Sequence, residues 1–460
     1  MSGKVGFLAI ARDTFDVPFA KATATEALET LRESLDTEVV GNADLATDAA
    51  AVAAQARALS DEEVEIVVAF QATFADSTLI REAESGLDCP LVLWAVPEER
   101  TGGRLRLNSL CGINLAAYVL ARAGVDYRWV YRASDDPEAP KELRRAIQSR
   151  PTEQKLNPPE HSEHSATAPN LRGLRIGLVG SHPEGFEPCD YDAGELEDRF
   201  GVSVDRIELE DLFAAAEAGD EDALATVRSD LDEAMDGLRD VNQAELDRSL
   251  RIFVGLSTLA EKRNWQGVAT RCWPECFTEF GGAACAGNSM LTSLGIPACC
   301  EADVYGDVTA LLLQELSATP PFVADLVDID MNTNTAAFWH CGLAPKELAP
   351  DGIRPSATVH SNRRKPLLNE FPLRPGRVTI TRLSQSQNRH RLLIAGGEML
   401  DEPLPFSGTS GVARLDTDAN QALDTIMSNG LEHHYGIAYG DHQGSLHAFA
   451  ASVGISVIEL

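Results

Sequence analysis

The 460-residue chain has little positive charge, and most of that charge is arginine. Lys and Arg number 39 against 71 Asp and Glu, so the formal net charge is -32, and only seven of the 39 are Lys. So negative a field repels phosphate backbones, which argues against a nucleic-acid partner. Acid excess with few lysines is typical of a cytosol of very high salt, so we expect a halophilic source.

Long hydrophobic runs are also missing. No run approaches the ~18 apolar residues that a membrane-spanning helix needs. The N-terminus, MSGKVGFLAIARDTF, has no small-residue cleavage site and indicates a first β-strand rather than a signal peptide. We therefore expect a cytoplasmic protein with no membrane partner. The nine Cys show no disulfide framework in so long a chain, so we expect reduced and mostly buried thiols.

Several familiar site motifs are absent. The stretch GLVGSHPEG is Gly-rich but lacks the GxGxxG spacing, and there is no GxxxxGK[ST]. No GxSxG elbow is present, and no Lys lies in the apolar context that a Schiff base favours. Cys272 with Cys276, and Cys299 with Cys300, are poor matches to the spacing of zinc sites.

The order of apolar runs predicts an α/β protein with three domains. In residues 1–165, β-branched-rich runs at 5–11, 64–70 and 91–96 alternate with Ala-rich helical patterns, which predicts a parallel sheet covered on both faces. The polar, Pro-rich stretch 151–170 predicts a linker. A second α/β domain follows over 171–350. Short strands with turn signals then predict a smaller β-rich, barrel-like domain over 351–460.

The residues best suited to chemistry lie between 265 and 345. Glu275 sits between Pro274 and Cys276, and a carboxylate among apolar neighbours is costly unless it is bound. Glu301 and Asp303 follow the run IPACC; at a strand end they would share one face, where open α/β sheets place ligands. His340 lies in FWHCG.

Carboxylates and imidazoles together are typical of a divalent-cation site. Oxygen ligands favour Mn²⁺ or Mg²⁺, and one or two imidazoles favour Mn²⁺. His433 and His434, in GLEHHYG, precede a strand-like stretch. Ordinary alternatives stay open: a structural ion pair for Glu275, a hydrogen-bonded core position for His340, and a solvated turn for the His pair. Trp rings near the acidic motif suit the C–H face of a carbohydrate.

Several long motifs resemble the L-fucose isomerase/L-arabinose isomerase superfamily, within its fucose isomerase-like branch. They are RCWPECF, CEADVYGDVTALLLQ, FWHCGLAP, GRVTITRL, AGGEMLDEP, GLEHHYGIAYGD, VAFQATFADSTLI and RLRLNSLCGINLAAYVL. The resemblance spans nearly the whole chain. It implies two Rossmann-like, doubly wound domains and a C-terminal barrel-type domain. It also implies homo-oligomers, hexamers or trimers, with sites near subunit interfaces.

The implied activity is a metal-dependent aldose–ketose isomerisation through an enediolate. The expected substrates are L-fucose, D-arabinose, L-arabinose or a similar sugar, and the expected cofactor is Mn²⁺ or another divalent cation such as Mg²⁺ or Co²⁺. Two carboxylates held by one cation would move the protons between C1 and C2.

The resemblance also assigns residues by motif. Glu275 matches the first metal-binding catalytic carboxylate, and the second is Asp303 or Glu301, depending on how EADVYG aligns. We expect Glu275 and Asp303 to be the catalytic pair. His434 matches the C-terminal ligand, and His340 resembles an additional one. The residues expected to contact the sugar are Trp273, Trp339, Tyr305, Gln71, Asn288 and His433.

An alternative interpretation is a protein of the same fold that has no catalytic activity. A non-catalytic sugar-binding or regulatory protein could close two lobes on a ligand, with its carboxylates bound to sugar hydroxyls and no metal. Sugar affinity that is indifferent to chelators would favour this alternative.

Overall fold

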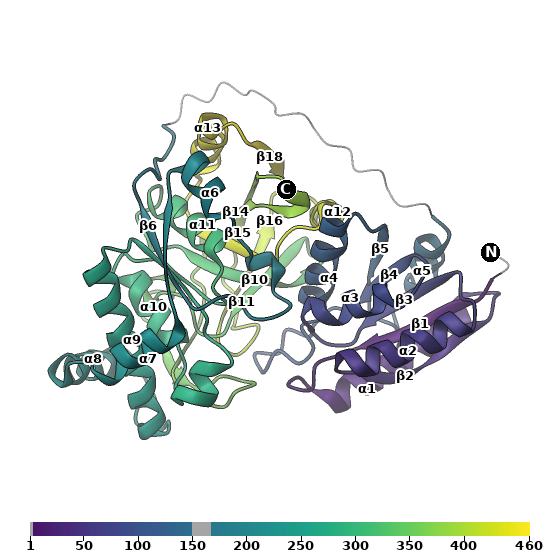
Figure 1. The fold of residues 1–460 in the computed structure, drawn as a ribbon, viewed down its shortest axis with the longest axis horizontal. Coiled ribbons are helices and arrows are strands. Elements are labelled where there is room, and N and C mark those ends of the chain that lie inside the picture. Colours follow the sequence, from purple (N-terminus) through teal and green to yellow (C-terminus); the bar gives the residue numbers. More distant parts are fainter. Residues whose placement is uncertain (1–2, 150–166) are drawn as a thin grey trace.

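The computed structural model describes residues 3–149 and 167–460 (Figure 1). Most of the predicted linker, 151–170, lies outside the described residues. Among those that are described, no helix combines the length and the apolar composition needed to cross a membrane.

The N-terminal part contains a parallel five-stranded sheet with helices on both faces. The strands, in spatial order, are β2 (Val39–Ala46), β1 (Val5–Ile10), β3 (Ile66–Gln71), β4 (Leu91–Ala95) and β5 (Tyr127–Tyr131). One face packs on α1 (Val17–Ser34) and α5 (Ala139–Gln148). The other packs on α2 (Ala49–Asp61), α3 (Ser77–Ser85) and α4 (Ser109–Ala123). Because both faces are covered, all six residues of β1 are buried.

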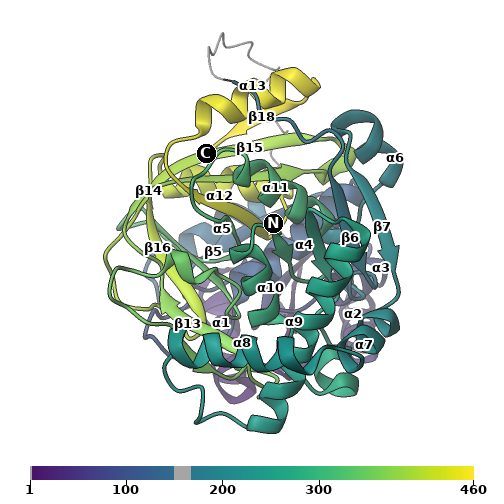
Figure 2. The same ribbon diagram turned by 90° about the vertical axis from the view of Figure 1, so that its left-hand side faces the viewer.

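A second parallel sheet follows, with four strands. Their order is β7 (Ser203–Ile207), β6 (Arg175–Val179), β8 (Gly267–Thr270) and β9 (Ala298–Cys299). The helices of this part are α6 (Ala193–Glu195), α7 (Leu209–Glu217), α8 (Glu221–Ala234), α9 (Gln243–Arg263), α10 (Cys285–Ser293) and α11 (Val304–Gln314). Figure 2 shows α8 at the opposite end of the molecule from α13 (Gln443–Val453).

The remaining strands form one mixed nine-stranded sheet. Their order is β12 (Ser356–Thr358), β13 (Leu368–Pro372), β16 (Thr409–Leu415), β11 (Thr335–His340), β10 (Phe322–Asp330), β17 (His434–Tyr439), β14 (Gly376–Ser384), β15 (Arg391–Met399) and β18 (Ser456–Glu459). Strand β15 also pairs with β16, so the six strands from β16 to β15 pair in a closed circuit. Helix α12 (Ala419–Asn429) packs against α4 of the first part.

The α/β class is confirmed, with two parallel sheets and one large mixed sheet. Strands β10 and β11 belong to the mixed sheet although they precede residue 351, where the sequence analysis began the last domain. The three domain ranges themselves stay predictions. A single hydrophobic cluster includes Leu8, Val268 and Tyr435, so all three sheets share one core. Loops at the strand ends therefore converge on a common region.

Candidate functional site

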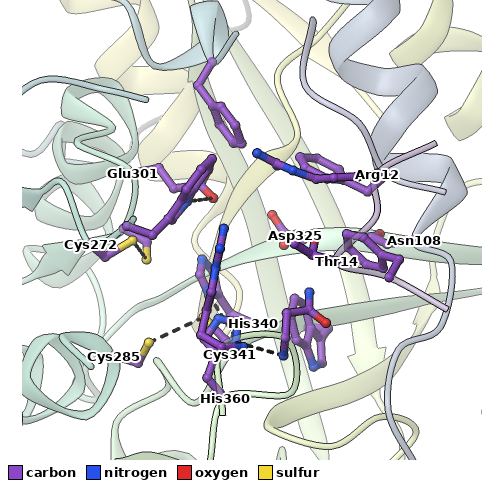
Figure 3. Close-up of a pocket in the computed structure, with 18 of the residues that line it drawn as sticks. Arg12, Thr14, Asn108, Cys272, Cys285, Glu301, Asp325, His340, Cys341 and His360 are labelled. Atoms are coloured by element: carbon purple, nitrogen blue, oxygen red, sulfur yellow. Dashed lines mark hydrogen bonds between the residues drawn. The ribbon is translucent and has the colours of Figure 1, made fainter. Parts of the chain in front are cut away.

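One pocket is lined by loops and strand ends from all three sheets (Figure 3). The first part contributes Arg12, which follows β1, and Asn108, which caps α4. The other lining residues used below are Cys272, Trp273, Cys285, Cys300, Glu301, Asp325, Trp339, His340, Cys341, Arg363 and His433. The pocket thus collects carboxylates, imidazoles, thiols and guanidinium groups.

Strand register brings the acidic and imidazole groups together. Asp325 on β10 is paired directly with His434 on the antiparallel strand β17. Asp325 also pairs with Trp339 on β11, next to His340 at the end of that strand. Glu301 follows β9 and has a φ of 61°, in the left-handed region that side chains other than Gly seldom adopt. Such backbone is found at functional sites, where the surroundings hold it in place.

The His434 ring is oriented by a buried carboxylate. Its Nδ1 lies 2.8 Å from Oδ2 of Asp303, and a carboxylate can only accept, so Nδ1 carries the proton. Nε2 then presents a lone pair. It lies 3.3 Å from Oδ1 of Asp325 and 3.5 Å from Oε2 of Glu301. This is the arrangement in which a second carboxylate fixes a metal-binding histidine.

The carboxylate of Asp303 is fully occupied by its hydrogen bonds with Arg382 and His434. Arg382 donates two hydrogen bonds to its carboxylate, at 2.6 and 3.0 Å, and both side chains are 1% exposed. Burial would raise the pKa of Asp303, but the charge of Arg382 and the hydrogen bond from His434 hold it well below its usual value. Asp303 does not line the pocket, so it acts through His434.

Glu301 has both oxygens engaged. Trp273 donates Nε1–H to Oε1 at 3.3 Å, and His433 Nε2 lies 3.2 Å from Oε2. Burial would raise the pKa of Glu301, yet the hydrogen bond from His433 lowers it. Burial also lowers the pKa of His433, so a neutral ring donates Nε2–H to Glu301. Burial raises the pKa of Asp325.

His340 faces the same cluster, but its Nδ1 carries the lone pair and its Nε2 the proton, the reverse of His434. The backbone N–H of Cys341 donates to His340 Nδ1 at 2.9 Å, so that nitrogen carries a lone pair. In a neutral ring the proton is then on Nε2, which makes Nε2 a donor rather than a metal ligand.

We call this buried group the carboxylate–histidine cluster; its members are Glu301, Asp325, His340, His433 and His434. The cluster fits a divalent cation. Four of its buried atoms have no hydrogen-bond partner among the described residues: Asp325 Oδ1, His340 Nε2, His433 Nδ1 and His434 Nε2. Buried polar atoms almost always have a partner, so these atoms point to a ligand. Donor atoms of Asp325, His340 and His434 lie within 4.8 Å of one another, as do those of Cys189, Glu301 and His434. Two carboxylates and one imidazole are a hard to borderline donor set.

Glu275 lies apart from this cluster. It does not line the pocket, and Arg271 holds both of its carboxylate oxygens, at 2.6 and 2.7 Å. The hydrogen bond from Arg271 lowers the pKa of Glu275, although partial burial opposes this. Arg271 also donates to the backbone carbonyls of Ser181 and His182, so the pair ties two loops together.

The residues expected to contact a sugar divide into two groups. Trp273, Trp339 and His433 line the pocket. Three others do not line it: the Tyr305 hydroxyl lies 2.6 Å from His390 Nε2, Gln71 donates to the Thr73 carbonyl, and Asn288 accepts from Thr270. These three side chains are buried elsewhere.

Three residues that line the pocket were not predicted from the sequence: Asp325, Arg12 and Arg363. Asp325 lies in FVADLVDID, where an acidic side chain interrupts an otherwise apolar strand, and that interruption is the same signal that drew notice to Glu275. Arg363 lies in HSNRRKP, an unusual cluster of basic residues in a chain of net charge -32.

Comparison with known proteins gives two family matches. The model for the fucose/sulfoquinovose isomerase N-terminal domain matches residues 6–149. The model for the L-fucose isomerase C-terminal domain matches residues 371–460. These ranges cover the first sheet and most strands of the mixed sheet.

Curated relatives match over longer ranges. The sulfoquinovose isomerase of Priestia aryabhattai is 30% identical over 440 residues, which is 95% of this chain and 94% of that protein. The sulfoquinovose isomerase of Alkalicoccus urumqiensis is 30% identical over 390 residues, or 84% of each chain. A solved substrate-binding protein of a sugar ABC transport system from Bordetella parapertussis matches at 13% identity and a TM-score of 0.18, over 71% of this chain and 84% of that one, which supports no conclusion.

Proposed function

Since this chain belongs to the fucose/sulfoquinovose isomerase family and is a sugar isomerase, we propose that it interconverts the aldose and ketose forms of a six-carbon sugar with an anionic group at C6. Sulfoquinovose, a glucose with a sulfonate in place of the C6 hydroxyl, is the model substrate. The observation that carries the proposal is that one pocket is lined both by carboxylates and imidazoles and by two arginines; these residues are Glu301, Asp325, His340, His433, Arg12 and Arg363. This substrate class replaces the neutral sugars expected from the sequence.

Glu301, Asp325 and His434 are the proposed ligands of a divalent cation, in place of Glu275 and Asp303. Their donor set favours Mn²⁺, because carboxylate oxygens suit hard cations and an imidazole suits the transition series. When bound, such a cation polarises a carbonyl oxygen and stabilises negative charge on neighbouring sugar oxygens. A buried and oriented ligand set needs little rearrangement to bind it.

Asp325 is the proposed carrier of the substrate proton. Its Oδ1 has no hydrogen-bond partner among the described residues, whereas both oxygens of Glu301 are engaged. A free carboxylate oxygen can take the proton from C2 of the aldose and return it to C1, and the carbonyl is left at C2 once the hydroxyl proton has passed from O2 to O1. Glu301, held by Trp273 and His433, stays ionised and fixed.

His340 is the proposed hydrogen-bond donor to the sugar carbonyl. Its Nδ1 accepts the backbone N–H of Cys341, so Nε2–H is free to donate into the pocket. Negative charge develops on the carbonyl oxygen as the C2 proton leaves. An imidazole N–H aimed at that oxygen stabilises the charge, and a site shielded from water strengthens the effect.

Two guanidinium groups supply the proposed contacts for the anion. The Arg12 guanidinium lies 4.8 Å from the centroid of the Trp273 ring, and that of Arg363 lies 5.4 Å from the same ring. Arg12 has Asp76 at 3.5 Å, but among the described residues Arg363 has no acidic partner in ion-pair contact. Burial and the like charge of Arg12 lower the pKa of Arg363, as expected for two cations that lack an anion between them.

The charge of the whole chain strengthens this argument. A formal net charge of -32 repels an anionic substrate, so binding requires a local excess of positive charge. Guanidinium groups bind oxyanions such as sulfonates with paired hydrogen bonds. Arg12 and Arg363 place that excess at the pocket.

A pair of sugars that differ in one group tests the proposal. We would assay isomerisation of sulfoquinovose and of 6-deoxyglucose, which lacks the sulfonate, with Mn²⁺ restored after EDTA treatment. Arg363→Met and Arg12→Met are each expected to raise KM for sulfoquinovose about 10- to 100-fold, the value of a charge-assisted hydrogen bond, with little change for 6-deoxyglucose. Arg206→Met, on an exposed arginine of β7, is the matched control.

The substrate assignment fails if the wild-type protein turns over 6-deoxyglucose as efficiently as sulfoquinovose. It also fails if Arg363→Met raises KM for both sugars by the same factor. Activity that survives EDTA treatment unchanged would contradict the metal dependence.

A further inference from the structure

Four buried cysteines gather on one wall of the pocket, although they come from four separate segments. Cys272 follows β8, Cys285 begins α10, Cys300 follows β9 and Cys341 follows β11. We call these four residues the thiol cluster. All four line the pocket. Because they are 13 or more positions apart in the chain, their spacing matches no zinc motif, and only the fold reveals the convergence.

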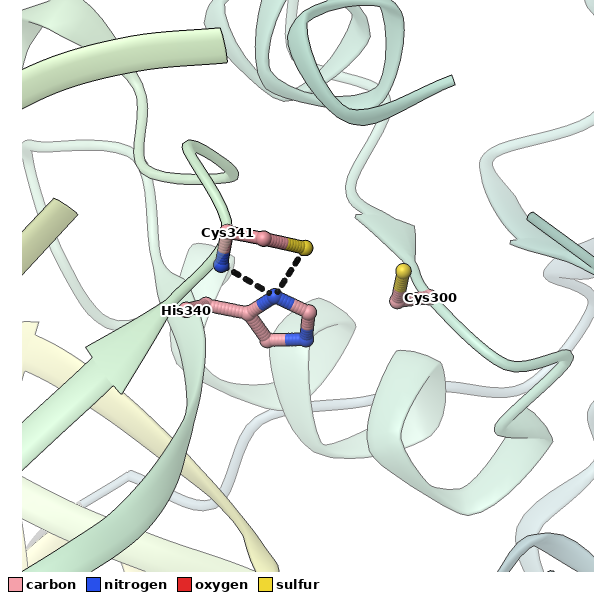
Figure 4. Close-up of side chains that lie close together, drawn as sticks. All are labelled: Cys300, His340 and Cys341. Atoms are coloured by element: carbon pink, nitrogen blue, oxygen red, sulfur yellow. Dashed lines mark hydrogen bonds between the residues drawn. The ribbon is translucent and has the colours of Figure 1, made fainter. Parts of the chain in front are cut away.

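The sulfur atoms form one connected group. Sγ of Cys272 lies 2.8 Å from Sγ of Cys300, and Sγ of Cys285 lies 3.6 Å from Sγ of Cys341. Donor atoms of Cys300, His340 and Cys341 lie within 4.8 Å of one another, which joins the two pairs. Figure 4 shows the Cys341 sulfur pointing toward Cys300. Tetrahedral Zn²⁺ with Zn–S bonds of ~2.3 Å needs sulfurs about 3.8 Å apart. The Cys285–Cys341 pair has nearly this spacing, and the Cys272–Cys300 pair would open on binding.

We propose that the thiol cluster binds one thiophilic divalent cation of the Zn²⁺ class through its four sulfur atoms. Thiolates select such cations over Mn²⁺ and Mg²⁺, whereas the carboxylate–histidine cluster favours the harder ions. Four protein ligands leave no open position, so the bound cation has a structural role. Each thiol releases its proton to solvent on binding.

Other buried cysteines lack this arrangement. The sulfur of Cys276 contacts the Arg271 carbonyl, and Cys299, although adjacent to Cys300, lies beside Asp307. Buried thiols that only fill space need not face one another. In the thiol cluster they do, at the boundary between the hydrophobic core and the pocket.

A cation in the thiol cluster would hold two site residues in place. Cys300 directly precedes Glu301, whose backbone is in the left-handed region, and Cys341 directly follows His340. Fixing both sulfurs to one ion ties the ends of β9 and β11 together. The thiol cluster therefore positions the pocket wall without touching the sugar carbons.

Metal content and absorption test the proposal without an activity assay. The full-length protein would be purified with Zn²⁺, treated with EDTA and analysed for Zn by mass spectrometry; a second sample would be loaded with Co²⁺. We expect about one Zn per chain to be retained, and an intense near-ultraviolet thiolate-to-Co²⁺ band. Cys300→Ser and Cys341→Ser should each lower retained Zn more than tenfold, whereas Cys299→Ser should retain it.

Two results would overturn the proposal: retained Zn near zero with no thiolate–Co²⁺ band, or a Cys272–Cys300 disulfide found by non-reducing peptide mapping. Circular dichroism would check that each variant folds. Cys285→Ser provides a second variant that is remote in sequence from Glu301 and His340. Either negative result leaves the isomerase proposal untouched, since that proposal uses the carboxylate–histidine cluster.

Discussion

Nδ1 of His434 lies 2.8 Å from Oδ2 of Asp303, and this hydrogen bond turns the other ring nitrogen toward Glu301 and Asp325. Arg382 holds the same carboxylate from its other side. These buried hydrogen bonds fix the orientation of His434, a proposed metal ligand, before a cation binds.

Asp303→Asn should weaken cation binding. Without a charged acceptor at Nδ1, His434 loses its fixed tautomer, and loss of such an outer partner typically costs 10–100-fold in metal affinity. Titration calorimetry with Mn²⁺ would measure the change. The variant should also unfold more readily, by about 3–5 kcal/mol, because Arg382 is left buried and unpaired. Equal Mn²⁺ affinity in the variant and the wild type would contradict the orienting role.

Asp325→Asn and Glu275→Gln should separate the two possible catalytic carboxylates. Removing the proposed proton carrier at residue 325 should lower kcat by about 10²–10⁴-fold. The variant at residue 275 should keep nearly full kcat and lose at most ~1 kcal/mol of stability, since its ion pair is partly exposed. Steady-state kinetics and urea unfolding would measure both. The reverse pattern would restore Glu275 as the catalytic group.

His340→Phe and His434→Gln should differ in metal content. Loss of a hydrogen-bond donor at residue 340 should lower kcat by about 10²–10³-fold while Mn²⁺ still binds. Loss of the ligand at residue 434 should abolish both the activity and the binding of Mn²⁺. Mn²⁺ per chain, determined by mass spectrometry after gel filtration, distinguishes the two. Loss of Mn²⁺ from the first variant would make His340 a ligand.

Asp307 predicts a pH dependence of stability. It is fully buried on α11, and burial together with the charge of Asp303 raises its pKa well above the usual value. Above pH ~4 the unfolded chain loses this proton while the folded chain keeps it, so stability falls as pH rises, by about 1.4 kcal/mol per unit. Asp307→Asn removes this cost. The unfolding free energy of the variant minus that of the wild type should grow between pH 5 and pH 7 in urea titrations; a constant difference would refute the assignment.

Much of the fold could be predicted from local patterns. The run VGFLAI is buried on both faces as β1, and the resemblance to sugar isomerases is confirmed by relatives that span most of the chain. A halophilic source, the oligomeric state and the identity of the cation stay predictions. The closed circuit of strands needs β11 to pair with β16 and β10 to pair with β17, and a turn pattern cannot predict these pairs because the strands lie far apart in the sequence.

The site was only partly predictable, for a physical reason. Glu301, His340 and His433, which the resemblance singled out, line one pocket, and His434 Nε2 lies 3.5 Å from Glu301; their roles stay predictions. Glu275 and Asp325 give the same local signal, a carboxylate among apolar residues, and only tertiary contacts show that Arg271 neutralises the first. The thiol cluster could not be predicted either. The spacing of its cysteines in the sequence argued against a zinc site, and only the fold brings them together.

The closed circuit of strands has a consequence for redesign. Asp325, His340 and His434 lie on β10, β11 and β17, three consecutive members of that circuit. Arg12 and Arg363 lie on loops outside it, and loops tolerate exchange far better than paired strands. Grafting new loops at these two positions offers a way to retarget the molecule to other sugars while its reaction chemistry is left intact.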